Sequence, residues 1–428
     1  MLFRSLSGPA AGVIACAAVA RASGFPNVIT GDMGGTSFDV SLVAGGEAAL
    51  AAQTSIEFGL VVRSPMIQIE TIGAGGGSIA SVDASGMLQV GPESAGSNPG
   101  PVCYGRGNTR PTVTDANVVL GRIAADRPLG GGLLHALDAK SAEKAIESCI
   151  AKPLGLDTLA AAEAVLTVAN AKMAGAIRVV SIERGHDPRQ FAYMPFGGGG
   201  ALHVCAMMRE VGVTTGIVPR YPGVTSALGC VMADMRHDAV QTINKPLAEL
   251  DLMHLKSLLA ELADACQKRL DSAGVRFASI QQIITLDMLY MGQTHTLQVN
   301  LDAVEITHHH IQSAFEKTYL ASFGRILSGI PIRVMNLRYA RVGVRPKFDL
   351  TILAPHGAGS TKSIGTQKVF HVGQWWDAKR YARLDLPVGS EITGPAILEQ
   401  ADTTVWLEPG FLARVDALGN LLVERVVQ

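Results

Sequence analysis

The order of apolar and polar positions predicts strands alternating with helices over the first part of the chain. Residues 28–43 show the pattern of strand, glycine-rich polar turn, strand, which predicts a β-hairpin. The apolar stretch 66–72 leads into a second run of glycines, and another hairpin is predicted over 79–90. A long alanine-rich helix is predicted over 159–184, where Asp157 stands in the position of an N-terminal cap.

A third glycine run connects a strand to a helix. The short apolar strand 191–195 is followed by four consecutive glycines, and a helix is predicted to begin at Ala201. This order leaves free backbone N–H groups at a helix start, which suits an anion. From about residue 240 the pattern becomes an amphipathic helix, paired strands and a tail of strands and turns. Because 428 residues exceed one ordinary core, we predict two domains, residues 1–240 and 241–428.

The first 25 residues allow two interpretations. The apolar run 8–20 contains Ala18, Val19 and Ala20, which resemble the end of a cleaved signal peptide. The run consists mostly of small residues and includes Pro9, which favours a small-residue helix that starts near this proline. No other segment is predicted to be long and apolar enough to span a bilayer.

Composition narrows the classes of partner. The 36 basic and 37 acidic residues leave a net charge of -1, so nothing attracts nucleic acid or a membrane surface electrostatically. The six cysteines form no C-x-x-C pair, which is typical of reduced thiols rather than a disulfide framework. We therefore expect a cytoplasmic protein with neither nucleic acid nor membrane as partner.

The turn at residues 32–39 combines two acids, two glycines and two hydroxyls. Glycine amides can face phosphate oxygens, and hydroxyls can donate to the same oxygens. The candidate phosphate-binding residues are Gly34, Gly35, Thr36 and Ser37. Asp32 is a candidate catalytic residue, and Asp32 and Asp39 are candidate Mg²⁺ ligands. A plain hairpin turn with satisfied aspartates explains the spacing equally well, and no Gly-Lys-Ser/Thr follows, so this is not a Walker loop.

Further candidates lie in the other glycine runs and beside them. The runs 73–78 and 197–200 could line a nucleotide cleft or could serve as tight turns. Their candidate cofactor-binding residues are Gly75, Gly76, Gly197, Gly198 and Gly199. His203 is a candidate for proton transfer, although a lone histidine is more often structural. Asp115 is a candidate catalytic acid, with helix capping as the competing interpretation.

These residues together resemble the hydantoinase A family, which also holds 5-oxoprolinase, N-methylhydantoinase A and the ATP-using subunits of acetone and acetophenone carboxylases. Several motifs in the right order carry the resemblance across nearly the whole chain. They are S-G-P-A-A-G at 7–12, D-M-G-G-T-S-F-D at 32–39, T-I-G-A-G-G-G-S at 71–78, G-P-E-S-A-G at 91–96, P-G-P-V-C-Y-G-R-G at 99–107, T-V-T-D-A-N at 112–117, E-R-G-H-D-P at 183–188, P-G-V-T-S-A-L-G at 222–229, Y-M-G-Q at 290–293 and G-P-A at 394–396. The family's F-G-G-A-G-P-L-H is replaced here by F-G-G-G-G-A-L-H, which retains His203.

The resemblance implies an α/β fold similar to actin, sugar kinases and Hsp70. Residues 1–240 would form a ribonuclease H-like lobe with a mixed sheet, the second half of an ATP clamp, and residues 241–428 an α+β domain. The 32–39 turn would be the phosphate loop of this lobe. The family normally carries a further N-terminal region with a first phosphate loop, and this sequence is expected to start after it.

The resemblance also implies a function. ATP with Mg²⁺, or with Mn²⁺ or K⁺, would phosphorylate a substrate carbonyl oxygen, and hydrolysis would then open a cyclic amide such as a hydantoin, an N-methylhydantoin or 5-oxoproline. Phosphoryl transfer depends on positioning and a cation more than on a protein nucleophile. The alternatives are a ketone carboxylase subunit, a catalytically incomplete scaffold fragment of such a complex, or an exported ligand binder. A hydantoinase B-type partner subunit and an oligomeric assembly are expected.

Overall fold

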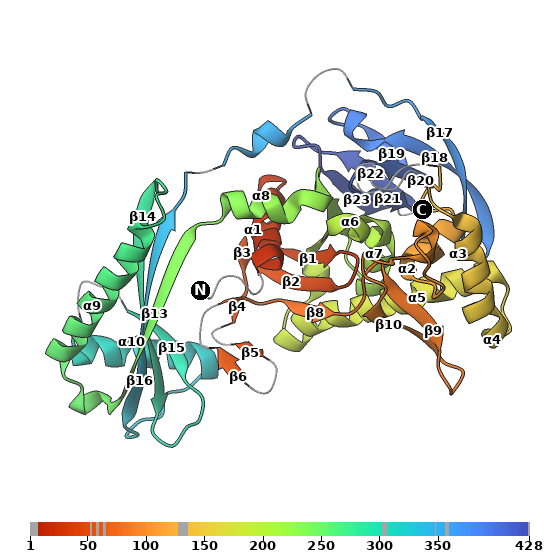
Figure 1. Ribbon diagram of the computed structural model, residues 1–428. Helices are drawn as coiled ribbons and strands as arrows, with labels where there is room; N and C mark the ends of the chain where they lie inside the picture. Colours follow the sequence, from red (N-terminus) through yellow and green to blue (C-terminus); the bar gives the residue numbers. More distant parts are fainter. Residues whose placement is uncertain are drawn as a thin grey trace. The chain divides into compact units, whose positions relative to one another are not determined.

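The computed structural model describes residues 7–51, 54–56, 60–62, 66–126, 136–301, 306–346, 348–355 and 359–426. The chain forms two compact units, coloured along the sequence in Figure 1. The first comprises Met1–Val231 with Asp349–Gln428, and the second comprises Met232–Phe348. The predicted second domain, 241–428, thus differs from the observed division, because the last eighty or so residues return to the first unit.

A mixed sheet forms the centre of the first unit. Five of its strands have the order β3–β2–β1–β11–β12. They are β1 (Val28–Met33), β2 (Phe38–Ala44), β3 (Glu47–Ala48), β11 (Ala192–Phe196) and β12 (Thr215–Val218). β1 is parallel to β11 and β11 to β12, whereas β1, β2 and β3 pair antiparallel. The mixed sheet that the resemblance implied is present, and the hairpin predicted over 28–43 is confirmed.

The C-terminal strands extend this sheet. β23 (Leu421–Arg425) pairs antiparallel with β12, β22 (Phe411–Val415) with β23, and β19 (Glu391–Thr393) with β22. β23 satisfies backbone groups of β12 that an open sheet edge would leave unpaired. This pairing joins segments about two hundred residues apart, so local periodicity did not reveal it.

Smaller sheets and hairpins complete the first unit. A four-stranded sheet has the order β17–β18–β20–β21, with β17 (Gly365–His371), β18 (Gln374–Ala382), β20 (Ala396–Glu399) and β21 (Thr404–Leu407). β9 (Ser78–Val82) and β10 (Leu88–Ser94) form the hairpin predicted over 79–90. β8 (Glu70–Ile72) pairs with β2. The short strands β4 (Leu50–Ala51), β5 (Thr54–Ile56), β6 (Leu60–Val62) and β7 (Met66–Ile67) pair as β4–β7 and β5–β6.

Helices pack on this framework. They are α1 (Ser7–Ala22), α2 (Val113–Val119), α3 (Ala139–Ile146), α4 (Lys152–Leu154), α5 (Thr158–Val180), α6 (Gly197–Gly200), α7 (Val204–Val211) and α8 (Thr225–Met232). The side chain of Asp157 accepts a hydrogen bond from the backbone N–H of Ala160 at 2.8 Å, so the predicted cap of α5 is confirmed. The small-residue helix predicted from Pro9 is present as α1.

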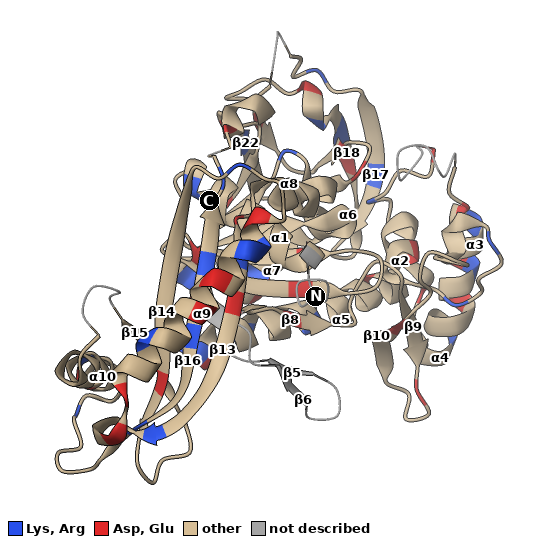
Figure 2. Cartoon of the chain, turned by 60° about the vertical axis from the view of Figure 1, so that its left-hand side comes forward, with Lys and Arg blue, Asp and Glu red and all other residues tan. Residues whose placement is uncertain are grey.

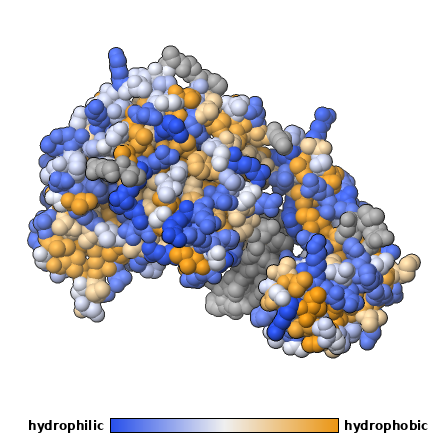
Figure 3. Space-filling model, turned by 180° about the vertical axis from the view of Figure 1, so that it is seen from behind, coloured by the Kyte–Doolittle hydropathy of each residue, from blue (hydrophilic) through white to orange (hydrophobic). Residues whose placement is uncertain are grey.

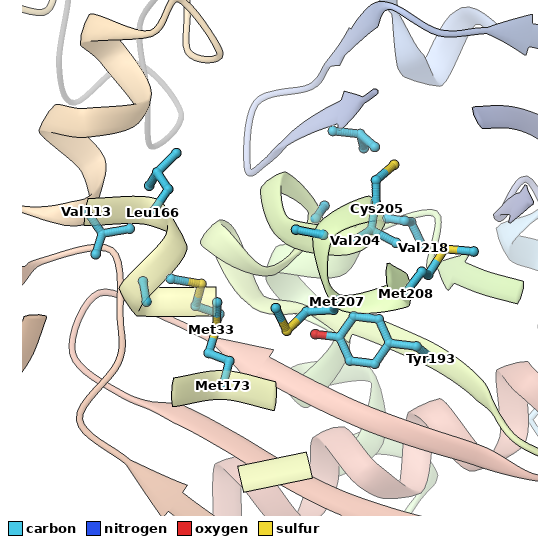
Figure 4. Packing of buried hydrophobic residues seen from close by; sticks show 14 of the residues in the cluster. Met33, Val113, Leu166, Met173, Tyr193, Val204, Cys205, Met207, Met208 and Val218 are labelled. Carbon is cyan, nitrogen blue, oxygen red and sulfur yellow. The ribbon is translucent and has the colours of Figure 1, made fainter. Parts of the chain in front are cut away.

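The α5 helix is the core helix of the first unit. Among the described residues, one helical segment, Thr158–Arg184, has the length and the apolar composition needed to cross a membrane. The sequence pattern had not indicated this. About half of its apolar stretch is buried inside the protein. Figure 4 shows Met173 beside Met33 of β1, and Tyr193 of β11 beside Met207 of α7. The apolar face of α5 therefore packs against the sheet and against α7.

The second unit is an α+β module. Its antiparallel sheet has the order β13–β16–β14–β15, and two helices contribute to the same core. The elements are β13 (Met235–Pro246), α9 (Leu252–Asp271), β14 (Ser279–Tyr290), β15 (Leu297–Leu301), α10 (His308–Phe323) and β16 (Ile332–Val344). α9 carries charges of both signs on its outer face (Figure 2). The predicted strand pair on either side of Gly292 is confirmed as β14 and β15.

The surface carries hydrophilic and hydrophobic residues (Figure 3). On the face that Figure 3 shows, hydrophilic and hydrophobic residues are interspersed in small groups. Apolar residues make up 48% of the chain, and many of them form the cores of the two units.

Two glycines allow α1 and α8 to cross at close range. A Cβ atom on Gly229 of α8 would overlap the carbonyl oxygen of Ala11 in α1. A Cβ atom on Gly12 of α1 would lie 2.5 Å from the Phe196 ring and 2.8 Å from the hydroxyl of Ser226. The two helices therefore fix the first turn of α8 against the end of β11.

We predict that Gly229→Ala destabilises the first unit by about 2 kcal/mol or more, because backbone atoms of α1 would have to move. The matched control is Gly175→Ala in α5, where a Cβ atom meets nothing within 4 Å. That change should be neutral or should stabilise by up to about 1 kcal/mol. Calorimetric melting of both variants checks the prediction, and equal melting temperatures would contradict it.

Candidate functional site

The hairpin turn between β1 and β2 places two carboxylates opposite each other. Asp32 on β1 and Asp39 on β2 are direct cross-strand partners. The backbone N–H of Gly34 donates to the carbonyl of Ser37 at 3.3 Å and closes the turn. Gly34, Gly35 and Thr36 are exposed, so the turn presents the main chain of Gly35 and Thr36 and the Thr36 hydroxyl to solvent. The turn thus lies between β1 and β2, where the sequence predicted it, and phosphate binding by it stays a prediction.

The second glycine run packs backbone to backbone on this turn. The N–H of Gly76 donates to the carbonyl of Gly34 at 3.0 Å, and that of Gly77 donates to the carbonyl of Gly35 at 2.6 Å. A Cβ atom on Gly75 would lie 2.5 Å from the backbone nitrogen of Thr36. Glycine is thus required at position 75 because two main chains meet there without intervening side chains.

The third glycine run reaches the same place from β11. Gly197 has φ +77, and a Cβ atom on it would overlap a carboxylate oxygen of Asp32 and the carbonyl of Met33. Since β1 and β11 are parallel, both strands end at this edge of the sheet, where open α/β sheets bind ligands. The structure therefore brings all three predicted glycine clusters together around Asp32.

Two negatively charged groups lie side by side in the carboxylate pair, with hydroxyl groups as hydrogen-bond partners. Burial and the charge of Asp39 raise the pKa of Asp32 to about 6, and a hydrogen bond from Ser226 opposes this shift. Asp39 accepts hydrogen bonds from the hydroxyls of Thr71 at 2.5 Å and Ser37 at 3.2 Å. Neutral hydroxyls orient the two carboxylates but do not neutralise their charge.

These residues fit a small divalent cation. Carboxylate and hydroxyl oxygens are the donors that Mg²⁺ takes, usually with one or two carboxylates and the remaining positions filled by water and phosphate. Within the described ranges no group of three or more His, Cys, Asp or Glu residues could hold a metal. The Asp32 and Asp39 pair thus matches a Mg²⁺ that is shared with a phosphate and does not match an all-protein metal cage.

Ser226 is a site residue that sequence reasoning missed. It lies in the first turn of α8, and its hydroxyl hydrogen-bonds to Asp32. A helix start adds partial positive charge beside the carboxylate. The only available signal was its membership of the motif at 222–229, which carried no chemical role by itself.

Asp115 is fully buried, and its carboxylate is occupied. It accepts hydrogen bonds from the backbone N–H groups of Cys103 at 2.7 Å, Val102 at 3.1 Å and Thr112 at 2.8 Å, and it completes a capping box at the start of α2. This geometry matches the capping interpretation rather than the catalytic one. Asp115 connects to the site through its neighbour Thr114, whose N–H and hydroxyl both donate to Gly76 at 2.8 Å.

His203 is also buried rather than presented to a substrate. Its Nδ1 lies 2.7 Å from the side-chain oxygen of Asn170 in α5, and its Nε2 has no partner among the described residues. Burial, with the charge of Arg122, lowers the pKa of His203 to about 3. The ring is therefore neutral at physiological pH and is hydrogen-bonded to α5 rather than to the carboxylate pair.

The depressed pKa of His203 predicts a pH dependence of stability. The unfolded chain takes up the proton first as the pH falls, so this group contributes fully above pH 6.5 and progressively less as the pH falls toward about 3. The loss is ~1.4 kcal/mol per pH unit in that window. His203→Gln should flatten the slope of unfolding free energy against pH by that amount. Denaturant titrations between about pH 6.5 and pH 4 test this, and an unchanged slope would refute it.

Comparisons with known proteins identify a family that matches the chain. The family model described as Hydantoinase/oxoprolinase matches residues 3–239, and its C-terminal domain model matches residues 248–423. The gap between the matches lies beside the boundary predicted at residue 240. Caprolactamase subunit alpha of Pseudomonas jessenii is 37% identical over 96% of this chain and 60% of that protein.

Two solved structures are similar to the chain. The nucleotide-free structure of acetone carboxylase, from work on ATP-dependent acetone carboxylation, has a TM-score of 0.82 and 27% identity over 98% of this chain and 61% of that one. The structure of the ATP-dependent caprolactamase from Pseudomonas jessenii has a TM-score of 0.76 and 35% identity over 97% and 61%. The predicted fold class, an α/β actin-like lobe with a C-terminal α+β domain, is confirmed. The chain spans about three fifths of the length of these relatives.

Proposed function

The chain belongs to the hydantoinase/oxoprolinase family, and on that premise we propose that it is the ATP-using subunit of an enzyme that opens a cyclic amide. In this proposal ATP phosphorylates the carbonyl oxygen of a lactam or hydantoin, and hydrolysis of the activated carbon follows. The observation that carries the proposal is the Asp32 and Asp39 pair beside three converging glycine loops. The relative named ATP-dependent caprolactamase supports the substrate class.

The residues of the site have separate tasks in this proposal. The N–H groups of Gly35 and Thr36 in the exposed turn bind phosphate oxygens, and the start of α6 at Gly197 places more amides at the same edge. Asp32 and Asp39 hold Mg²⁺ directly or through water. When bound, the cation neutralises charge on the phosphates during transfer.

The second task of Asp32 is proton transfer. In this proposal Asp32 accepts a proton from the water molecule that attacks the activated carbon, and its raised pKa, about 6 before a cation binds, makes it a stronger base than an ordinary aspartate. Its hydrogen bond with Ser226 orients the carboxylate for either task. Asp115 and His203 support the site from buried positions in this proposal.

We also propose a hydantoinase B-type partner and a cytoplasmic, oligomeric assembly. The relative named caprolactamase subunit alpha is one subunit of a larger enzyme, which supports a partner chain. In the described part of the chain all six cysteines are free thiols, which suits a reducing compartment.

Ketone carboxylation is the second candidate function, because the acetone carboxylase structure is so similar to this chain. The two functions differ in their need for bicarbonate. Phosphate release from ATP should be measured with the chain and its B-type partner, across lactams, hydantoins and 5-oxoproline, and across ketones with and without bicarbonate. Turnover of cyclic amides without bicarbonate supports the first function, whereas bicarbonate-dependent turnover of ketones replaces it with the second.

We predict opposite effects of Asp32→Asn on metal-bound and metal-free nucleotide. With Mg²⁺ present, ATP affinity should fall about tenfold or more, because a ligand of the cation is lost. With a chelator present, ATP affinity should stay the same or rise, because one negative charge near the phosphates is removed. Asp39→Asn should show the same pattern.

The matched control for this experiment is Asp83→Asn. Asp83 is an exposed turn aspartate of the β9–β10 hairpin, and its carboxylate accepts backbone hydrogen bonds from Ser85 and Met87. Calorimetric titration should give wild-type affinities for this variant. Equal Mg²⁺-ATP affinity of Asp32→Asn and the wild type would remove Asp32 from the cation site, and no binding to any variant would overturn the proposed function.

A further inference from the structure

One turn of the C-terminal segment lies between the two helix starts that border Asp32. Residues 400–403 connect β20 to β21. The hydroxyl of Thr403 donates to the carbonyl of Gly198 in α6 at 3.1 Å. The carboxylate of Asp402 accepts a hydrogen bond from the backbone N–H of Gly223 at 2.8 Å, directly ahead of α8. A single turn thus contacts both elements that place Gly197 and Ser226 at the carboxylate pair.

The contact with Gly223 leaves no room for a side chain. A Cβ atom on Gly223 would lie 2.6 Å from a carboxylate oxygen of Asp402 and 2.7 Å from its Cβ. The contact with Asp402, 179 residues further along the chain, therefore explains why the motif at 222–229 has a glycine at position 223. The approach is close enough that Asp402 determines where the chain enters α8.

The turn is itself held in place by a buried arginine. The Gln400 side-chain amide donates to the other carboxylate oxygen of Asp402 at 2.5 Å, and its oxygen accepts from Arg383 at 2.8 Å. Arg383 is only 4% exposed and also donates to the carbonyl of Val218 at the end of β12 at 2.9 Å. A buried guanidinium needs all these acceptors, so the arrangement is rigid. Asp402 is thereby fixed relative to the central sheet.

Both oxygens of Asp402 already accept hydrogen bonds within the protein, one from Gly223 and one from Gln400. Asp32, by comparison, accepts a hydrogen bond from the hydroxyl of Ser226. Asp402 is thus suited to holding backbone in place and not to binding a ligand.

We propose that Asp402 is a positioning residue for the cation and phosphate site. It fixes the entry to α8, and through it the hydroxyl of Ser226 against Asp32, while its neighbour Thr403 fixes the start of α6. The identity of the ligand rests on the proposed function, but the positioning is a property of the chain itself. The Asp402 turn, which lies within the segment matched at 248–423, then contributes to the site formed by the segment matched at 3–239.

The test compares Asp402→Ala with Asp83→Ala in the full chain. Asp83 performs the same task in a remote hairpin, accepting from two backbone amides and from the side-chain amide of Gln89 at 3.2 Å. Hydrogen exchange of the peptides covering residues 197–203 and 222–230 is measured, with Mg²⁺-ATP affinity by calorimetry. Asp402→Ala should raise exchange about tenfold in residues 222–230 and weaken Mg²⁺-ATP binding about tenfold. Asp83→Ala should change neither.

Two further variants keep the proposal falsifiable if Asp402→Ala folds poorly. Thr403→Val removes only the hydroxyl and should raise exchange in residues 197–203 but not in 222–230. Asp402→Asn keeps one acceptor oxygen for Gly223 and should recover part of the lost affinity. A lower melting temperature with unchanged exchange at both segments would overturn the proposal. If the wild type binds no Mg²⁺-ATP, the proposed function fails, and the exchange result alone then decides whether Asp402 positions the helix.

Discussion

The site depends on main chain meeting main chain at the end of β1. Gly75 lies against the backbone of Thr36, and Gly197 against Asp32 and Met33, at distances where no Cβ atom fits. Such close approaches exclude side chains, so backbone amides are the groups that can contact a ligand there. Backbone amides are also the groups that bind a phosphate in loops of this kind. The glycines are therefore the condition under which three separate segments can surround one carboxylate pair.

That close packing also creates an electrostatic cost. Asp32 and Asp39 are direct cross-strand partners, and like charges opposite each other are destabilising. The surrounding groups are hydroxyls of Ser37, Thr71 and Ser226, which orient the oxygens without adding positive charge. The pKa of Asp32 is therefore raised, because burial and the negative charge of Asp39 both disfavour its ionised form. A site that keeps two carboxylates together in this way is suited to a cation that arrives with its own anionic ligand.

Local elements could be predicted because neighbours in the chain determine them. The hairpin over 28–43, the Asp157 cap of α5 and the β14–β15 pair all follow from nearby residues. The three glycine clusters were found for the same reason. The roles of Asp115 and His203 could not be judged locally, because their burial depends on α5 and on the loop at 102–103.

The longest-range contacts were beyond local reasoning, and they explain how the chain is organised. The chain leaves the first unit directly after α8, whose first turn holds Ser226, and returns at Asp349. The returning segment then supplies β23 to the open edge of β12 and the Asp402 turn to the entry of α8. The second unit is thus inserted between two segments that both support the same helix start. The tail pairs with the sheet and the Asp402 turn hydrogen-bonds to Gly223, so the chain that returns after the insertion contacts both the sheet edge and the helix start beside the carboxylate pair.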